Sequence, residues 1–220
     1  MFSALADLHR ALRFWTRARS SGRLPVVRRA WRNSVMGALL CAACAAPAWA
    51  AVSVEGVPFD EAARVAGHEL LLNGTGLRSV FVIKGYVAGL YLPERAKNAA
   101  VILGMKGPKR LQIHPLREVG ADTFIHALND GIHRNQTEIQ VQKLADRLTQ
   151  LEDAMRQIGA TKRGDTINFD YTPEAGTTIS INGVARTKAI PGEDFYQAVL
   201  RIFIGDYPVD RELKSGLLGT

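Results

Sequence analysis

Arg78 is the residue whose surroundings most clearly suggest chemistry. It lies in an apolar run from Asn73 to Pro93, which reads NGTGLRSVFVIKGYVAGLYLP. No acidic residue occurs between Glu69 and Glu94, so the run offers the guanidinium no partner for an ion pair. A buried cation without a partner is strongly disfavoured. Arg78 therefore either lies on a solvated face or points inward. In the second case it pairs with a distant carboxylate or with the anionic group of a ligand.

The same run predicts a β-hairpin that would position Arg78. Strand-forming residues on both sides of Lys84-Gly85 predict two strands joined by a two-residue turn at that point. In this register Arg78 faces Tyr91 at one end of an apolar strip, and Gly89 leaves room between them. A slip of one residue would move Tyr91 to the other face and bring Tyr86 to this one. The strip suits an apolar ligand with an anionic or carbonyl head group, so Arg78, Tyr86 and Tyr91 are the candidate ligand-binding residues.

Other motifs that could carry chemistry are weak. The chain has no GxSxG, HExxH or Walker sequence. Gly74 and Gly76 supply only part of a dinucleotide fingerprint and lead into a strand, so we interpret them as a turn and expect no cofactor. His126, Asp130 and His133 share one side of a predicted helix, but no second segment supplies further ligands. We interpret that side as a solvated face and predict no metal site.

The first fifty residues predict a secretory signal. They contain eight arginines, no lysine and one acidic residue, and they end in an apolar run from Val35 to Ala46 followed by Pro47 and Ala48-Trp49-Ala50. This order is typical of a bacterial signal cleaved after Ala50. The alternative is an uncleaved anchor, although the apolar run is short for a membrane span. We therefore predict a signal peptide at residues 1–50, one domain at residues 51–220, and a periplasmic location.

Charge and cysteine content exclude several classes of function for the predicted domain. Residues 51–220 contain 20 basic and 20 acidic residues, so the net charge of +7 belongs to the first fifty. Without a basic surplus, we expect no nucleic-acid partner. Cys41 and Cys44 also precede the domain, which therefore has neither a disulfide nor a cysteine nucleophile. No long apolar run follows residue 50, so we expect no transmembrane segment after cleavage, and we predict no oligomeric state.

Hydrophobic periodicity predicts strands, two helices, more strands and a final helical region. The predicted strands, besides the hairpin, are Val52–Phe59, Ala63–Leu72, Arg110–His114, Asp165–Tyr171, Thr177–Ile181 and Val184–Ile190. The predicted helices are Ala121–Arg134, Glu138–Ile158, Glu193–Ile204 and a short one at Asp210–Leu218. The second helix is too short for a coiled coil and favours packing on a sheet. The third is apolar nearly all round, which indicates burial. This order predicts an α+β fold with a mainly antiparallel sheet.

Three segments in order resemble a known family. They read LLNGTGLR…KGYVAGLYLP, GDTINFDYTPEAGTTISINGV and IPGEDFYQAVLRIFIGDYPVDRELKSGLLG. Together they resemble the bacterial chalcone isomerase-like proteins over essentially all of residues 51–220. The resemblance implies an open-faced β-sandwich, in which an antiparallel sheet is packed by a layer of helices with a cleft between them. The family includes plant chalcone isomerases, which cyclise chalcones to flavanones, and plastid relatives that bind fatty acids without catalysis.

The resemblance also implies roles for single residues. Arg78 matches the family's arginine, which follows the glycine pair, and Tyr86 stands where the isomerases have a threonine. The nearest counterparts of the isomerases' tyrosine and asparagine are Phe124 and Gly131. Their last active-site hydroxyl falls at Pro191-Gly192-Glu193. Only the arginine is kept, which implies an anion-holding cation and argues against isomerase activity.

These observations suggest three alternative functions. The first is periplasmic, non-catalytic binding of a small hydrophobic ligand, a fatty acid or similar carboxylate, or a phenolic compound. The second is an intramolecular lyase of the chalcone isomerase type, in which the guanidinium stabilises enolate charge. The third is an envelope interaction module without a ligand, which predicts no enclosed cavity and an Arg78 that is solvated or paired within the chain.

Overall fold

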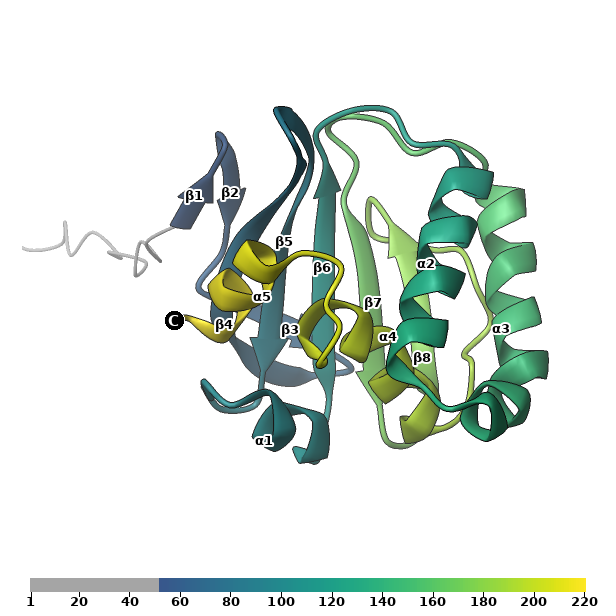
Figure 1. Cartoon of the computed structure of the whole chain (residues 1–220). Helices are drawn as coiled ribbons and strands as arrows, with labels where there is room; N and C mark the ends of the chain where they lie inside the picture. The colour runs from purple at the N-terminus through teal and green to yellow at the C-terminus, as the bar shows by residue number, and fades with distance from the viewer. Residues whose placement is uncertain (1–51) are drawn as a thin grey trace, which may run out of the picture. The chain divides into compact units, whose positions relative to one another are not determined.

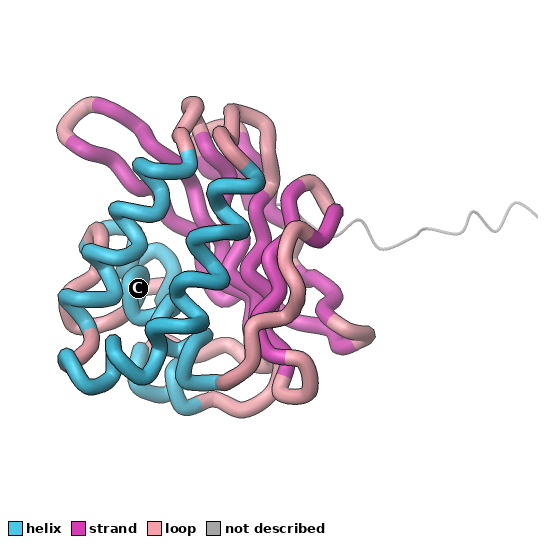
Figure 2. The backbone as a smooth tube through the Cα atoms, turned by 90° about the vertical axis from the view of Figure 1, so that its right-hand side faces the viewer, coloured by secondary structure: helices cyan, strands magenta, loops and turns pink. Residues whose placement is uncertain are grey.

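The computed structural model describes residues 52–220, which form a curved antiparallel sheet with helices on one face (Figures 1 and 2). The predicted signal peptide and its cleavage site lie outside this range. Each strand of the seven-stranded sheet pairs with the strand before it in the chain. The strands are β3 (Ala62–Val65), β4 (His68–Val80), β5 (Ile83–Leu92), β6 (Lys109–Pro115), β7 (Ile167–Thr172), β8 (Gly176–Ile181) and β9 (Val184–Ala185). A separate hairpin consists of β1 (Val52–Val54) and β2 (Val57–Phe59).

The helices are α1 (Ala99–Gly104), α2 (Ala121–Asn135), α3 (Glu138–Ile158), α4 (Glu193–Ile204) and α5 (Arg211–Leu218). Helices α2 to α5 confirm the sequence prediction closely, and α1 is an additional short helix. Helix α3 begins at a capping box in which Thr137 and Gln140 satisfy each other's backbone N–H groups. Helix α4 is almost entirely buried, as its apolar surface predicts. In residues 52–220, no helix combines the length and the apolar character that crossing a bilayer requires.

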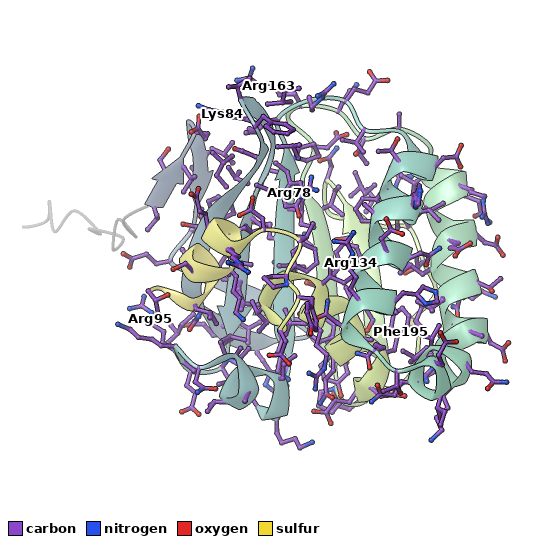
Figure 3. The ribbon with its side chains drawn as sticks, viewed as in Figure 1. Arg78, Lys84, Arg95, Arg134, Arg163 and Phe195 are labelled. Carbon is purple, nitrogen blue, oxygen red and sulfur yellow. The ribbon has the colours of Figure 1, made fainter. Side chains whose placement is uncertain are left out.

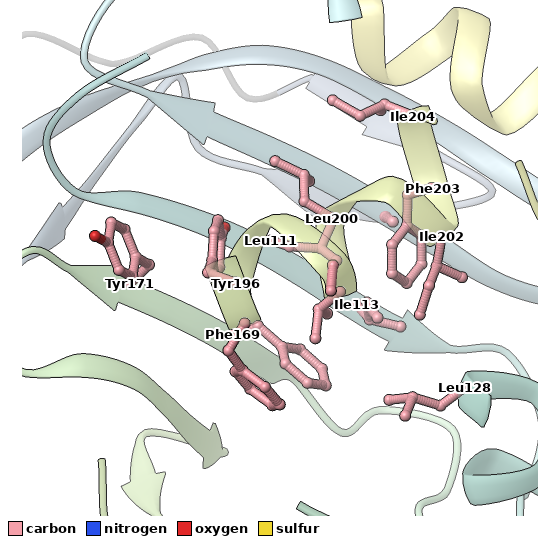
Figure 4. Close-up of a cluster of buried hydrophobic side chains, with 14 of the residues drawn as sticks. Leu111, Ile113, Leu128, Phe169, Tyr171, Tyr196, Leu200, Ile202, Phe203 and Ile204 are labelled. Carbon is pink, nitrogen blue, oxygen red and sulfur yellow. The ribbon is translucent and has the colours of Figure 1, made fainter. Parts of the chain in front are cut away.

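The sheet carries a separate apolar layer on each face. On the inner face, side chains of β5 to β8 pack against the helices, and Figure 4 shows part of this core, where β6 and β7 meet α4. On the outer face, a smaller cluster gathers under the β1–β2 hairpin: Phe59, Val65, Leu70, Leu72, Val87 and Tyr91. The predicted α+β fold, with an antiparallel sheet packed by a layer of helices, is confirmed.

The first two predicted strands each contain a turn that the sequence did not indicate. Val52–Phe59 is a hairpin that turns at Glu55-Gly56, and Ala62–Val80 contains a second turn at Ala66-Gly67. All four turn residues have positive φ, from 49° to 85°. The predicted strand Val184–Ile190 is shortened to β9, since Ile190 leaves the β8–β9 hairpin and instead bridges Thr177.

The central hairpin turns three residues earlier than predicted. Val80 pairs with Ile83, so Phe81-Val82 forms the turn and Lys84-Gly85 lies within β5. The earlier turn moves the partner of Arg78 away from Tyr91, and a bulge between Arg78 and Ser79 places it opposite Tyr86. This register turns Ala88, Leu90 and Leu92 toward the helices while Val87 and Tyr91 enter the outer cluster. Burial of apolar side chains on both faces fixes this choice.

The glycine pair lets α5 lie directly on β4 and does not form a turn. Gly74 and Gly76 belong to β4. A Cβ atom on Gly76 would lie 2.8 Å from the carbonyl oxygen of Leu213, and one on Gly74 would collide with that of Gly216. Asn73 fastens the same contact, because its amide donates a hydrogen bond of 2.8 Å to the carbonyl of Leu217. Backbone therefore packs on backbone at this edge of the sheet.

We predict that Gly76→Ala lowers the free energy of unfolding by about 1–3 kcal/mol, because the new methyl group must push α5 away from β4. Gly104→Ala is the matched control, since nothing lies within 4 Å of a Cβ atom at Gly104. Urea denaturation measures both. Equal stability of the two variants would contradict the proposed role of the close contact.

Candidate functional site

A cavity of about 460 Å³ lies between the inner face of the sheet and the helices. Its walls are mainly apolar side chains from β6, β7, α2 and α4: Ile113, Pro115, Ile167, Phe169, Phe124, Leu128, Val199, Ile202 and Phe203. The rings of Phe124 and Phe169 stack with their centroids 6.3 Å apart and close one side. Volume and lining are those of a site for a small hydrophobic ligand.

Arg78 supplies a cation to the wall of this cavity (Figure 3). Its Nε atom is buried and finds no hydrogen-bond partner within residues 52–220. Among residues 52–220, no carboxylate forms an ion pair with it. The guanidinium carbon lies 5.8 Å from the centroid of the Tyr86 ring, which gives the charge a weak cation–π contact. The residue as a whole is half-buried, so its donors remain available to water or to an acceptor in the cavity.

Tyr86 is the second polar residue of the cavity wall. It lies opposite Arg78 in the β4–β5 pair. Burial holds the pKa of its phenol well above the usual value, and the charge of Arg78 opposes that shift only in part. Asp210 raises the pKa of Tyr86 further, while its own carboxylate accepts a hydrogen bond from the Leu213 amide at the start of α5. Tyr86 thus stays protonated at neutral pH and presents a hydrogen-bond donor.

The mouth of the cavity is formed by two loops and the β4–β5 hairpin. Leu116 donates a backbone hydrogen bond of 2.9 Å to Gly85, and Val119 pairs with Thr161. The lining here includes Val80, Ile83, Arg117, Glu118, Thr123 and Thr161. These loop residues were not predicted, because no periodic pattern marks them in the sequence and only the folded loops bring them to the cavity.

The structure brings Arg78 and Tyr86 together but removes Tyr91 from the site. Tyr91 is 1% exposed and belongs to the outer cluster. Burial, with Asp60 adding to it, raises the pKa of Tyr91 to about 12. Gly89 also faces outward, where a Cβ atom would lie 2.7 Å from the Phe59 ring. The room that glycine leaves is thus occupied by Phe59 and not by a ligand.

The positions that correspond to the isomerases' other active-site groups lack those groups here. Phe124 lines the cavity without a hydroxyl. Gly131 packs against Ile202, to which a Cβ atom would come within 2.6 Å, and does not reach the cavity. Glu193 lies outside the cavity and forms an ion pair of 2.8 Å with Lys106.

The histidine face of α2 is a solvated surface. His126 Nδ1 lies 3.5 Å from an oxygen of Asp130, and both side chains are mostly exposed. Within residues 52–220, no group of histidine, cysteine and acidic side chains is placed to hold a metal ion.

A family model described as chalcone isomerase-like matches residues 51–219. The chain belongs to the chalcone isomerase-like family. No curated protein matches it in sequence. Among solved structures, it is similar to a fatty-acid binding protein of Arabidopsis thaliana, with a TM-score of 0.62 and 14% identity. The match covers 77% of this chain and 96% of that protein. At this identity the match shows a shared fold, and it confirms the predicted open-faced β-sandwich of the family.

We predict that Arg78→Met leaves the free energy of unfolding of the ligand-free protein unchanged within about 1 kcal/mol, or raises it, because the guanidinium has no internal partner to lose. Arg110→Met is the matched control. Arg110 donates two hydrogen bonds of 2.6 Å to Asp170, so its loss should cost roughly 2–3 kcal/mol. Chemical denaturation of delipidated protein compares them, and a similar loss in both variants would show that Arg78 is paired within the chain.

Proposed function

We propose that this protein binds a fatty acid or a similar hydrophobic carboxylate in the cavity, without catalysing a reaction. The single observation that carries the proposal is the buried, unpartnered Nε of Arg78 at the wall of an apolar cavity of about 460 Å³. A carboxylate can accept two parallel hydrogen bonds from a guanidinium, and such charge-assisted pairs are short and strong. The carboxylate head group would pair with the guanidinium of Arg78, and the apolar walls would enclose the tail.

The tail supplies most of the affinity in this arrangement. Each buried CH₂ group contributes about 0.8 kcal/mol, so a long chain outweighs the head contact of about 1.5–3 kcal/mol. Arg78 and the protonated Tyr86 then select the head group and fix its orientation. The fatty-acid binding named for the similar Arabidopsis protein supports this ligand class.

The cavity wall supports binding more than catalysis. Chalcone cyclisation needs groups that position a phenolate and stabilise enolate charge. Besides Arg78 and Tyr86, the polar lining residues are those of the mouth: Arg117, Glu118, Thr123 and Thr161. The rest of the lining is apolar, and Phe124 stands where the isomerases have a tyrosine. An apolar cavity of this size also disfavours an interaction module without a ligand.

Arg78→Ala should weaken the binding of a long-chain fatty acid by about 10- to 150-fold, because one charge-assisted contact is lost. Tyr86→Phe should weaken it by about 2- to 10-fold. Tyr91→Phe is the control and should bind as the wild type does, because Tyr91 lies on the outer face. Isothermal titration calorimetry on delipidated protein measures these affinities.

Native mass spectrometry of the purified protein should show a bound acid that is absent from Arg78→Ala. The proposal is wrong if no acid co-purifies and none binds on titration. Naringenin chalcone tests the isomerase alternative, since a rate above the uncatalysed one in an absorbance assay would establish catalysis.

We further propose that the protein acts in the periplasm after export. The arginine-rich start, the apolar run and Ala48-Trp49-Ala50 support an exported protein. We expect cell fractionation to recover it in the periplasm with Ala51 as its first residue, as peptide mass spectrometry can read. A cytoplasmic protein that keeps residues 1–50 would contradict export.

A further inference from the structure

The turn of the β4–β5 hairpin exposes apolar side chains where turns usually carry polar ones. Phe81 and Val82 are 97% and 93% exposed, and the flanking Val80 and Ile83 are about half exposed. Within residues 52–220 this is the most exposed group of consecutive large apolar residues. We call Val80–Ile83 the hairpin tip. Exposed apolar groups of this kind mark surfaces that bind a partner.

The backbone of the hairpin tip is also unfavourable for its sequence. Phe81 has a φ of 53°, a left-handed conformation that bulky residues adopt rarely. Two-residue hairpin turns prefer asparagine, aspartate or glycine at such positions. This backbone conformation and the exposure of the Phe81 ring both lower the stability of the hairpin. A functional contact for that side chain would explain why they are present.

The hairpin tip adjoins the mouth of the cavity. Val80 and Ile83 line the cavity, whereas Phe81 and Val82 extend beyond it. Figure 1 shows the hairpin reaching the same end of the sheet as the loops that follow β6 and precede β7. A hydrophobic ligand that enters or leaves there passes beside the hairpin tip.

Basic side chains surround this end of the domain. Arg117, Lys162 and Arg163 are exposed on the two loops. Their acidic neighbours there are the exposed Glu118 and the half-buried Asp165, whose carboxylate accepts a hydrogen bond from the Lys162 amide. Lys84, next to the hairpin tip, is half exposed and forms an ion pair of 2.6 Å with Glu55 (Figure 3). Apolar side chains that insert between lipids, flanked by cations that meet lipid phosphates, are the two components of interfacial membrane binding.

We propose that the hairpin tip docks on the surface of an anionic lipid bilayer, with Phe81 and Val82 inserted at the level of the head groups. The cavity mouth then faces the bilayer, so a fatty acid can move between membrane and cavity without crossing water. The docking needs no ligand, while the transfer role rests on the proposed function.

Vesicle flotation tests the docking with the full chain. The probes are phosphatidylcholine vesicles with and without phosphatidylglycerol. Phe81→Ser/Val82→Ser should bind roughly tenfold more weakly than wild type, because two inserted apolar side chains are lost. Ile139→Ser is the matched control, since Ile139 is 67% exposed on α3, and it should stay within about twofold of wild type. Residues 1–50 are identical in all three proteins and contribute equally.

Hydrogen exchange locates the contact within the chain. Peptides that cover residues 79–84 should exchange more slowly when vesicles are present, and those from α3 should not. The proposal is overturned if the double variant floats as well as Ile139→Ser does. It is also overturned if the variant abolishes a concentration-dependent dimer and leaves vesicle binding intact, because the hairpin tip would then contact a second copy of the chain.

Two further measurements separate this proposal from the ligand proposal. The double variant should keep the wild-type affinity for a fatty acid in solution but take the acid from vesicles more slowly. Arg78→Ala should lose affinity in solution and still float with vesicles. If Arg78→Ala binds the acid normally, the ligand proposal fails and the docking is unaffected. If the double variant takes up the acid from vesicles at the wild-type rate, the transfer role fails.

Discussion

The alternation of side chains along β5 is the constraint on which the site depends. Both faces of this strand are covered, so each residue must suit either the helix layer or the outer cluster. Tyr86 and Leu90 face inward, and Val87 and Tyr91 face outward. A shift by one residue would bury the wrong set on both faces at once. The bulge beside Arg78 then sets that side chain opposite Tyr86, which is how a cation reaches the cavity wall.

The sequence predicted the helices and the inner strands well because their signals are redundant. Helix α3 has both a hydrophobic stripe and a capping box, and α4 is bounded by Gly192 and Gly205. The hairpin turn was mispredicted because Lys84-Gly85 has the composition of a turn while Phe81-Val82 has that of a strand. Local propensity was overridden by burial on the two faces of the sheet.

The same distinction explains how much of the site the sequence could show. Arg78 was recognisable because a charge without a partner inside an apolar run is a local signal. The position of Tyr86 followed only once the register was known, and the outward position of Tyr91 for the same reason. Thr161 and Arg117 meet at the cavity mouth through the pairing of loops over forty residues apart, which no local pattern records.

A buried cation does not by itself imply a ligand, as Lys109 demonstrates. Lys109 is 2% exposed. Its Nζ donates a hydrogen bond of 3.3 Å to the carbonyl of Gly107 and lies 5.2 Å from the centroid of the Tyr171 ring. Burial lowers the pKa of this amine, although the charge of Glu193 opposes the shift. In general, a buried lysine amine can become neutral by losing a proton.

Arg78 lacks that route. A guanidinium stays charged at any physiological pH, and no carboxylate among residues 52–220 forms an ion pair with it. The two residues differ also in what surrounds them, since Arg78 borders the cavity and Lys109 does not. A permanent charge beside an apolar space is most stable when an anion with an apolar tail occupies that space. The physical requirement of Arg78 and the shape of the cavity thus specify the same class of ligand.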